Sequence, residues 1–208
     1  MPQFATTIIS DENQVDDRLF DFGLSRFQLI AVADVARRWA LDASPLMPLN
    51  APGTLAYIYG VNELRSQLLD SSWKVDRVCG VEAVLNRQIE LRIAFQNVDR
   101  ACDPIFAPIP RSSKGSASEL MNGPTLFEHF GVETGPLTGV AEDGVTTYYV
   151  MVGEDGSVEL SQPVIAGGMF KAFIERIFIR GAGPDFGVEI DLGNEPVEDF
   201  DIPVRLRA

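Results

Sequence analysis

Long apolar runs, cysteines and histidines are all scarce in this chain of 208 residues. No apolar stretch approaches the roughly 18 residues that a membrane-spanning helix needs. The N-terminal sequence MPQFATTIISDENQVDDR lacks the basic start and the apolar stretch of a secretory signal. The two cysteines, Cys79 and Cys102, are too few for a disulfide framework. These absences predict a cytoplasmic protein with free thiols, and its 46% apolar content is enough for a sizeable core.

Basic side chains are also in the minority. The chain has 17 Lys and Arg residues against 30 Asp and Glu residues, which gives a formal net charge of −13. An acidic surface repels the phosphates of nucleic acids and the head groups of anionic membranes. Direct nucleic-acid binding and membrane binding are therefore disfavoured, and a basic surface on another protein is the favoured partner.

The motifs of common cofactor and metal sites are missing. No G-x-x-x-x-G-K-[ST] sequence occurs, and no G-x-G-x-x-G follows a predicted strand. Two cysteines and the single histidine, His129, do not supply the four ligands of a zinc site. We therefore expect no cofactor and no metal, although distant carboxylates could still assemble a magnesium or calcium site. Nucleophilic catalysis would need His129 to meet Cys79 or Cys102, and the spacing does not indicate that it does.

Apolar periodicity near 3.6 residues predicts two helices in the first third of the chain. Ser25 is suited to cap the first, which runs to about Asp42, and the second runs from about Thr54 to Leu69. Gly60 costs the second helix about 1 kcal/mol relative to Ala, which a helix tolerates if another backbone comes close. The flanking segments are predicted to be a short strand (FATTII), a loop or helix entry (11–22) and three antiparallel strands (73–98).

The stretch from residue 146 to residue 179 is predicted to be the centre of the fold. Residues 146–152 read as a strand, and two glycines around two acids at 153–156 favour a hairpin turn. A second strand follows at 157–164, and Pro163 either ends it or places it at a sheet edge. Apolar residues then recur at helical spacing over 169–178. We therefore expect a single α+β domain over residues 1–208, with N-terminal helices packed on a largely antiparallel sheet and a C-terminal hairpin–helix unit.

Residues 99–144 form the least regular region, with five prolines and many glycines. Short helices fit residues 116–121 and 125–130. A segment of this length without strong periodicity is often functional or mobile. It contains a basic, hydroxyl-rich run whose backbone N–H groups and two cations could hold an anion, namely Arg111, Ser112, Ser113 and Lys114.

Acidic residues are concentrated near the C-terminal end. Seven of the seventeen residues from 185 to 201 are acidic and none is Lys or Arg: Asp185, Glu189, Asp191, Glu195, Glu198, Asp199 and Asp201. Long-range attraction to such a tract would speed association with a basic partner. The leading hypothesis is therefore a non-enzymatic protein that binds a basic macromolecular surface through this tract. One version is a nucleic-acid-mimicking inhibitor whose carboxylates take the place of phosphates.

Two other functions remain open. Asp76, Glu90 and Arg92 have a spacing faintly like that of metal-dependent nucleases or phosphoesterases, in which such groups hold a metal and polarise a phosphate. A cross-strand salt bridge is the more common reason for the same pattern. The third hypothesis is a structural or assembly subunit, for which a homodimer is one arrangement.

Overall fold

The computed structural model describes residues 6–78, 80–111, 144–166 and 169–181. They form three helices and a seven-stranded mixed sheet, which confirms the α+β class. The elements in chain order are β1 (Thr7–Ile9), α1 (Glu12–Asp21), α2 (Arg26–Leu41), α3 (Ala51–Leu68), β2 (Trp73–Val78), β3 (Val81–Asn86), β4 (Leu91–Asn97), β5 (Thr146–Val152), β6 (Val158–Ala166) and β7 (Met169–Arg180).

The sheet consists of two antiparallel meanders joined through one parallel pair. Its strand order is β1-β7-β6-β5-β4-β3-β2. The strands β2, β3 and β4 pair antiparallel in turn, and so do β5, β6 and β7. Between the meanders, β4 pairs with β5 in parallel, from Leu91↔Thr146 to Asn97↔Val152. The carboxyl ends of β4 and β5 therefore lie side by side at one end of the sheet.

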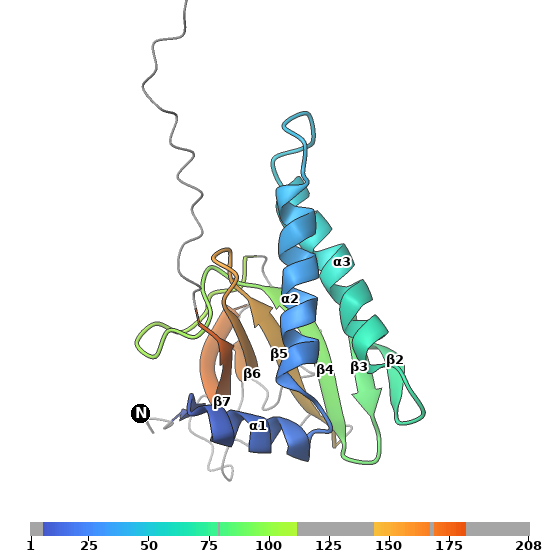
Figure 1. Cartoon of the computed structure of the whole chain (residues 1–208), viewed down its shortest axis with the longest axis vertical. Coiled ribbons are helices and arrows are strands. Elements are labelled where there is room, and N and C mark those ends of the chain that lie inside the picture. The colour runs from blue at the N-terminus through green and yellow to red at the C-terminus, as the bar shows by residue number, and fades with distance from the viewer. Residues whose placement is uncertain (1–5, 79, 112–143, 167–168, 182–208) are drawn as a thin grey trace, which may run out of the picture.

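The helices α2 and α3 form a hairpin that covers one face of the sheet (Figure 1). The contacts of α3 are with β3 and β4, and those of α2 are with β6 and β7. In Figure 1, α1 lies along the bottom of the sheet, where it contacts β7. Leu29, Val32, Leu64 and Val150 are among the buried side chains of the core between helices and sheet. No helix in the described ranges has the length and hydropathy needed to cross a membrane.

The predicted bounds of α2 are confirmed because both of its ends carry clear local signals. The Ser25 side chain accepts a hydrogen bond from the Gln28 N–H, and the Gln28 side chain accepts one from the Ser25 N–H, which completes a capping box. Asp42 is the C-cap. The next helix, α3, begins three residues before the predicted start at Thr54. Pro52 fits the first helical turn, where a missing N–H removes no intrahelical hydrogen bond.

Residues 11–22, predicted to be a loop or a helix entry, include the helix α1. The Asp11 side chain caps it by accepting hydrogen bonds from the N–H groups of Asn13 and Gln14. Val15 and Leu19, four residues apart, are both fully buried. The many acidic residues obscured this narrow apolar stripe in the sequence, because they all lie on the exposed side of the helix.

The prediction for Pro163 was wrong, because β6 continues through it and is an interior strand. The pairing of β6 with β7 shifts register between Gln162 and Pro163, and again between Val164 and Ile165. An irregularity of this kind is one of the few interior positions at which a strand tolerates proline, since one ladder N–H is not needed there.

The predicted helix at 169–178 was also wrong, because these residues belong to the strand β7. The β-bulge opposite Pro163 leaves an extra residue in β7, so Phe173 and Ile177 belong to different core clusters despite their even spacing. Apolar residues on both faces and a broken alternation together mimic helical spacing. The overlooked signal was the high content of Phe and Ile, which favours a strand.

Gly60 lets α3 pack closely on β4. A Cβ at this position would lie 2.5–2.8 Å from three ring carbons of Phe95. The close neighbour is therefore an aromatic ring and not the backbone that the sequence led us to expect. Phe95 is almost fully buried, so its ring has little room to move.

We expect Gly60→Ala to destabilise the protein by about 1–2 kcal/mol, because the cost of overpacking exceeds the gain in helix propensity. Gly53, in the first turn of the same helix, offers a control, since a Cβ there would meet no heavy atom within 4 Å. Gly53→Ala should leave stability unchanged or raise it by up to about 1 kcal/mol. Chemical denaturation measures both changes. A Gly60→Ala protein as stable as the wild type would contradict the close packing on Phe95.

Candidate functional site

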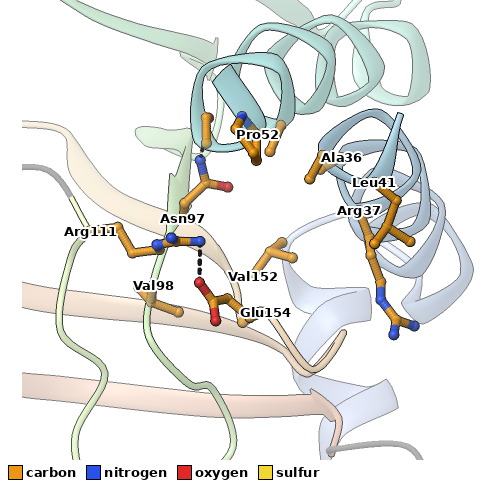
Figure 2. A pocket seen from close by; sticks show the side chains of 13 residues that line it. Ala36, Arg37, Leu41, Pro52, Asn97, Val98, Arg111, Val152 and Glu154 are labelled. Atoms are coloured by element: carbon orange, nitrogen blue, oxygen red, sulfur yellow. Dashed lines mark hydrogen bonds and ion pairs between the residues drawn. The ribbon is translucent and has the colours of Figure 1, made fainter. Parts of the chain in front are cut away.

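A cavity of about 490 Å³ lies where α2, α3 and the carboxyl ends of β4 and β5 meet (Figure 2). Its volume is within the range of roughly 300–1,000 Å³ that is typical of small-molecule sites. The lining residues are Ala36, Arg37, Ala40, Leu41, Pro52, Gly53, Ala56, Asn97, Val98, Arg111, Val152, Gly153 and Glu154.

Small residues on the two helices leave room for the cavity. Ala36 and Ala40, four residues apart, lie on one side of α2, and Gly53 and Ala56 lie on one side of α3. Figure 2 shows Ala36 on the wall formed by α2 and Pro52 on the wall formed by α3. Larger side chains at these positions would fill the space between the helices and the strand ends. Apart from Arg37, the helical part of the lining is therefore apolar and lies close to the backbone.

The strand side of the cavity carries most of its charged and hydrogen-bonding groups. Arg111 Nη1 lies 2.5 Å from Glu154 Oε1, in the ion pair drawn in Figure 2. The Arg111 N–H donates to Asn97 O at 3.1 Å, and Asn97 Nδ2 donates to Gly53 O at 2.9 Å. The side chains of Arg111 and Glu154 are 46% and 62% exposed, and an ion pair so open to solvent contributes only about 0–1 kcal/mol. The two side chains can therefore separate at little cost.

The turn that carries Glu154 is held from two sides. Gly156 has a φ of 83°, the left-handed conformation that the glycine-flanked turn predicted. Arg180 on β7 donates from Nε and Nη2 to Gly156 O at 3.1 and 2.9 Å, and its Nη2 lies 2.7 Å from Asp34 Oδ1 on α2. The Arg37 guanidinium packs against Gly156 and points away from the Arg111 ion pair in Figure 2. The backbone of the turn that carries Glu154 is therefore held in place.

The loop of residues 99–111, which ends at the cavity, is fastened to the sheet by a buried ion pair. Arg176 on β7 donates to the two carboxylate oxygens of Glu159 on β6 at 3.0 and 2.7 Å, and both side chains are buried. Glu159 also accepts a hydrogen bond from the Cys102 N–H at 2.6 Å, and Arg176 donates to Asp103 O at 2.8 Å. Removing either charge would leave the other uncompensated in the interior, at a cost of about 3–5 kcal/mol. The position of the loop is therefore strongly determined.

Asp76 and Arg92 form an ion pair from which Glu90 is separated. Arg92 Nε lies 2.5 Å from Asp76 Oδ2, and Arg92 is fully buried. Glu90 is exposed in the turn before β4. Asp76 lies level with Ala94 in the sheet, because both pair with Ala83. Glu90 precedes Ala94 by four residues, which is about 13 Å along the strand direction. Across the described ranges, no group of three or more His, Cys, Asp or Glu side chains is placed to hold a metal ion. The structure thus shows a salt bridge at this pattern.

Several predicted site residues lie outside the described residues. These are Ser112, Ser113 and Lys114 of the anion-binding run, the seven acids of the 185–201 tract, and Cys79 and His129. The short helices predicted at 116–121 and 125–130 also lie outside them. Arg111, the first residue of the anion-binding run, is described and lines the cavity. The roles assigned to the others stay predictions.

Sequence reasoning identified Arg111 and the turn that carries Glu154 but missed the cavity that joins them. The parallel pairing of β4 with β5 brings them together, and no local pattern reveals that pairing. The available signal was the small residues Ala36, Ala40 and Gly53 on helices otherwise rich in large apolar side chains.

Comparison of the chain with protein-family models, curated proteins and solved structures gives no match.

Cys102 is a candidate nucleophile that the structure describes, and its surroundings make it inert. Its Sγ faces Val158 O at 2.9 Å and Arg180 O at 3.3 Å. Burial, reinforced by the nearby Glu159 carboxylate, raises the pKa of the Cys102 thiol to about 12. Because the thiolate is the reactive form, the thiol should be almost unreactive near neutral pH.

In a Cys79→Ser background, we expect Cys102 at about pH 8.5 to be alkylated about a thousandfold more slowly in the folded protein than in the unfolded chain. A pKa of about 12 leaves far less thiolate than the ordinary value near 8.5 does. Timed alkylation followed by mass spectrometry measures the two rates. Similar rates, with the fold shown to be intact by circular dichroism, would mean that burial does not suppress the thiolate and would restore the thiol as a candidate nucleophile.

Proposed function

We propose that this protein binds a small molecule in the cavity between α2, α3 and the carboxyl ends of β4 and β5. The observation that carries the proposal is the position of the cavity, at the carboxyl ends of a parallel strand pair. In open α/β sheets, loops diverge at such ends and leave crevices in which ligands bind, and the same geometry applies here by analogy. A volume of about 490 Å³ suits a molecule of metabolite size.

The composition of the lining supports recognition of a largely apolar ligand. Alanine, leucine, proline and valine side chains provide most of the surface, and Arg111, Glu154 and Asn97 add polar groups at one side. Binding sites commonly combine an apolar surface with a few convergent polar groups that orient the ligand. No Cys, His, Ser, Tyr or Lys is among the described lining residues. What this lining supplies is therefore shape, apolar contact and one exchangeable ion pair.

The acidic-tract hypothesis is our second candidate, because the acidity of the chain is unevenly distributed. The described residues hold 18 of the 30 Asp and Glu residues and 14 of the 17 Lys and Arg residues. The net charge of −13 therefore divides into −4 for the described residues and −9 for the others, mainly the segments 112–143 and 182–208. Within the described residues, Arg side chains already pair with many carboxylates, as Arg65 and Arg77 do with Glu82. A basic partner would be attracted mainly to the remaining segments.

Filling the cavity should weaken binding of a neutral apolar probe, for which N-phenyl-1-naphthylamine is suitable. We expect the wild type to bind it and the variants Ala40→Phe and Gly53→Phe, which add a ring from opposite helices, to bind it at least about tenfold more weakly. Leu46→Phe is the matched control, since Leu46 is exposed in the α2–α3 loop and outside the lining. Fluorescence titration gives the affinities. A wild type that does not bind, or unchanged binding in both filled variants, would contradict the proposal.

The second candidate predicts a complex that is sensitive to salt. A pull-down from an extract of the native cell should recover basic partners at low ionic strength and lose them near 1 M salt, where the Debye length falls to about 3 Å. A variant with the seven acids of the 185–201 tract changed to their amides should lose the same partners at low salt. Partners retained at high salt, or by the neutralised variant, would refute docking through this tract.

A further inference from the structure

The ion pair at the cavity indicates what kind of ligand the site takes. Glu154 reaches from the turn after β5, and its Oε1 lies 2.5 Å from Arg111 Nη1 (Figure 2). We infer that the Glu154 carboxylate occupies the position beside Arg111 that an acidic group of the ligand takes when the ligand binds. The cavity would then accept an apolar molecule with a single carboxylate, sulfonate or phosphate group, which replaces Glu154 beside Arg111. This inference rests on the proposed binding of a small molecule in the same cavity.

The charge of the lining favours a ligand with one negative charge. The described lining includes two arginines and one acid, but the Arg37 guanidinium points away from the Arg111–Glu154 pair (Figure 2). Arg111 is therefore the charge that remains at the cavity when Glu154 turns aside. The first turn of α3 adds to this potential, because Gly53 lines the cavity and the Asn50 side chain makes no capping hydrogen bond. The N-terminal end of a helix carries a partial positive charge. A monoanion would therefore balance the charge of Arg111 in place of Glu154.

Exchange of Glu154 for the acidic group of a ligand needs only side-chain rotation. More than half of the Glu154 side chain is exposed, so its carboxylate can turn into solvent and remain hydrated. The turn beneath it is held by Arg180, which donates to Gly156 O, and these hydrogen bonds do not involve Glu154. Arg111 keeps its backbone hydrogen bond to Asn97 throughout. Its guanidinium presents a fork of N–H donors that suits carboxylate, sulfonate and phosphate groups alike.

Two fluorescent probes with the same aromatic body test the inference directly. These are 1-anilinonaphthalene-8-sulfonate, which is a monoanion, and N-phenyl-1-naphthylamine, which is neutral. We expect the wild type to bind the sulfonate about tenfold more tightly than the neutral probe. Arg111→Ala should remove this preference without changing the affinity for the neutral probe. Glu154→Gln removes the internal competitor and should raise the sulfonate affinity by about threefold or more, again with no change for the neutral probe.

Arg100→Ala is the matched control, because Arg100 is a half-exposed arginine on the same loop that does not line this cavity. It should leave both affinities unchanged. Arg111→Lys keeps the charge and should retain part of the sulfonate preference, which keeps the test decisive if Arg111→Ala fails to fold. Circular dichroism of each variant separates loss of binding from loss of structure.

The outcomes distinguish this inference from the proposed function. Equal affinities of the wild type for the two probes, or a preference that survives Arg111→Ala, would overturn the inference and leave ligand binding in place. Failure of both probes to bind the wild type would overturn the proposed function itself. The proposed function would also be overturned if Ala40→Phe and Gly53→Phe left the affinity for both probes unchanged.

Discussion

Seven residue pairs in parallel register, from Leu91↔Thr146 to Asn97↔Val152, hold the two antiparallel meanders together as one sheet. Parallel neighbours cannot be joined by a tight turn, so the chain leaves the sheet at the carboxyl end of β4 and returns at the opposite end to begin β5. The departing loop therefore lies beside the turn that follows β5. The cavity forms between these two segments and the ends of α2 and α3.

Buried polar groups reinforce this arrangement. The Glu159–Arg176 pair binds the backbone of the 99–111 loop and so fixes the path of the chain toward the cavity. A second group ties α1 to the sheet, where Arg18 pairs with Glu175 at 3.2 Å and the Tyr148 hydroxyl donates to Glu175 at 2.6 Å. Burial, and then Glu175, raise the pKa of Tyr148, so its hydroxyl remains a donor. Such groups determine geometry more than they add net stability.

The cavity combines a rigid frame with one weak contact. Small residues on the helices and the anchored Gly156 turn set its shape, whereas the Arg111–Glu154 pair is open to solvent and contributes little to stability. A site of this kind needs little reorganisation to admit a ligand, because only the weak contact must change. The contrast between the buried Glu159–Arg176 pair and the exposed Arg111–Glu154 pair thus separates a structural role from the proposed binding role.

Local signals in the sequence were enough for the capping box at Ser25, the alternating strands of the β2–β4 meander and the positive φ of Gly156, because each depends on residues close together in the chain. They were not enough for α1, because its two buried apolar residues are surrounded in the sequence by acidic residues. They were not enough for β7 either, because the bulge opposite Pro163 gives its apolar residues a spacing like that of a helix. Only the tertiary structure decided that Arg111 meets Glu154 at the end of a parallel strand pair. Which strands share hydrogen bonds depends on the packing of the whole sheet, and no short stretch of sequence records it.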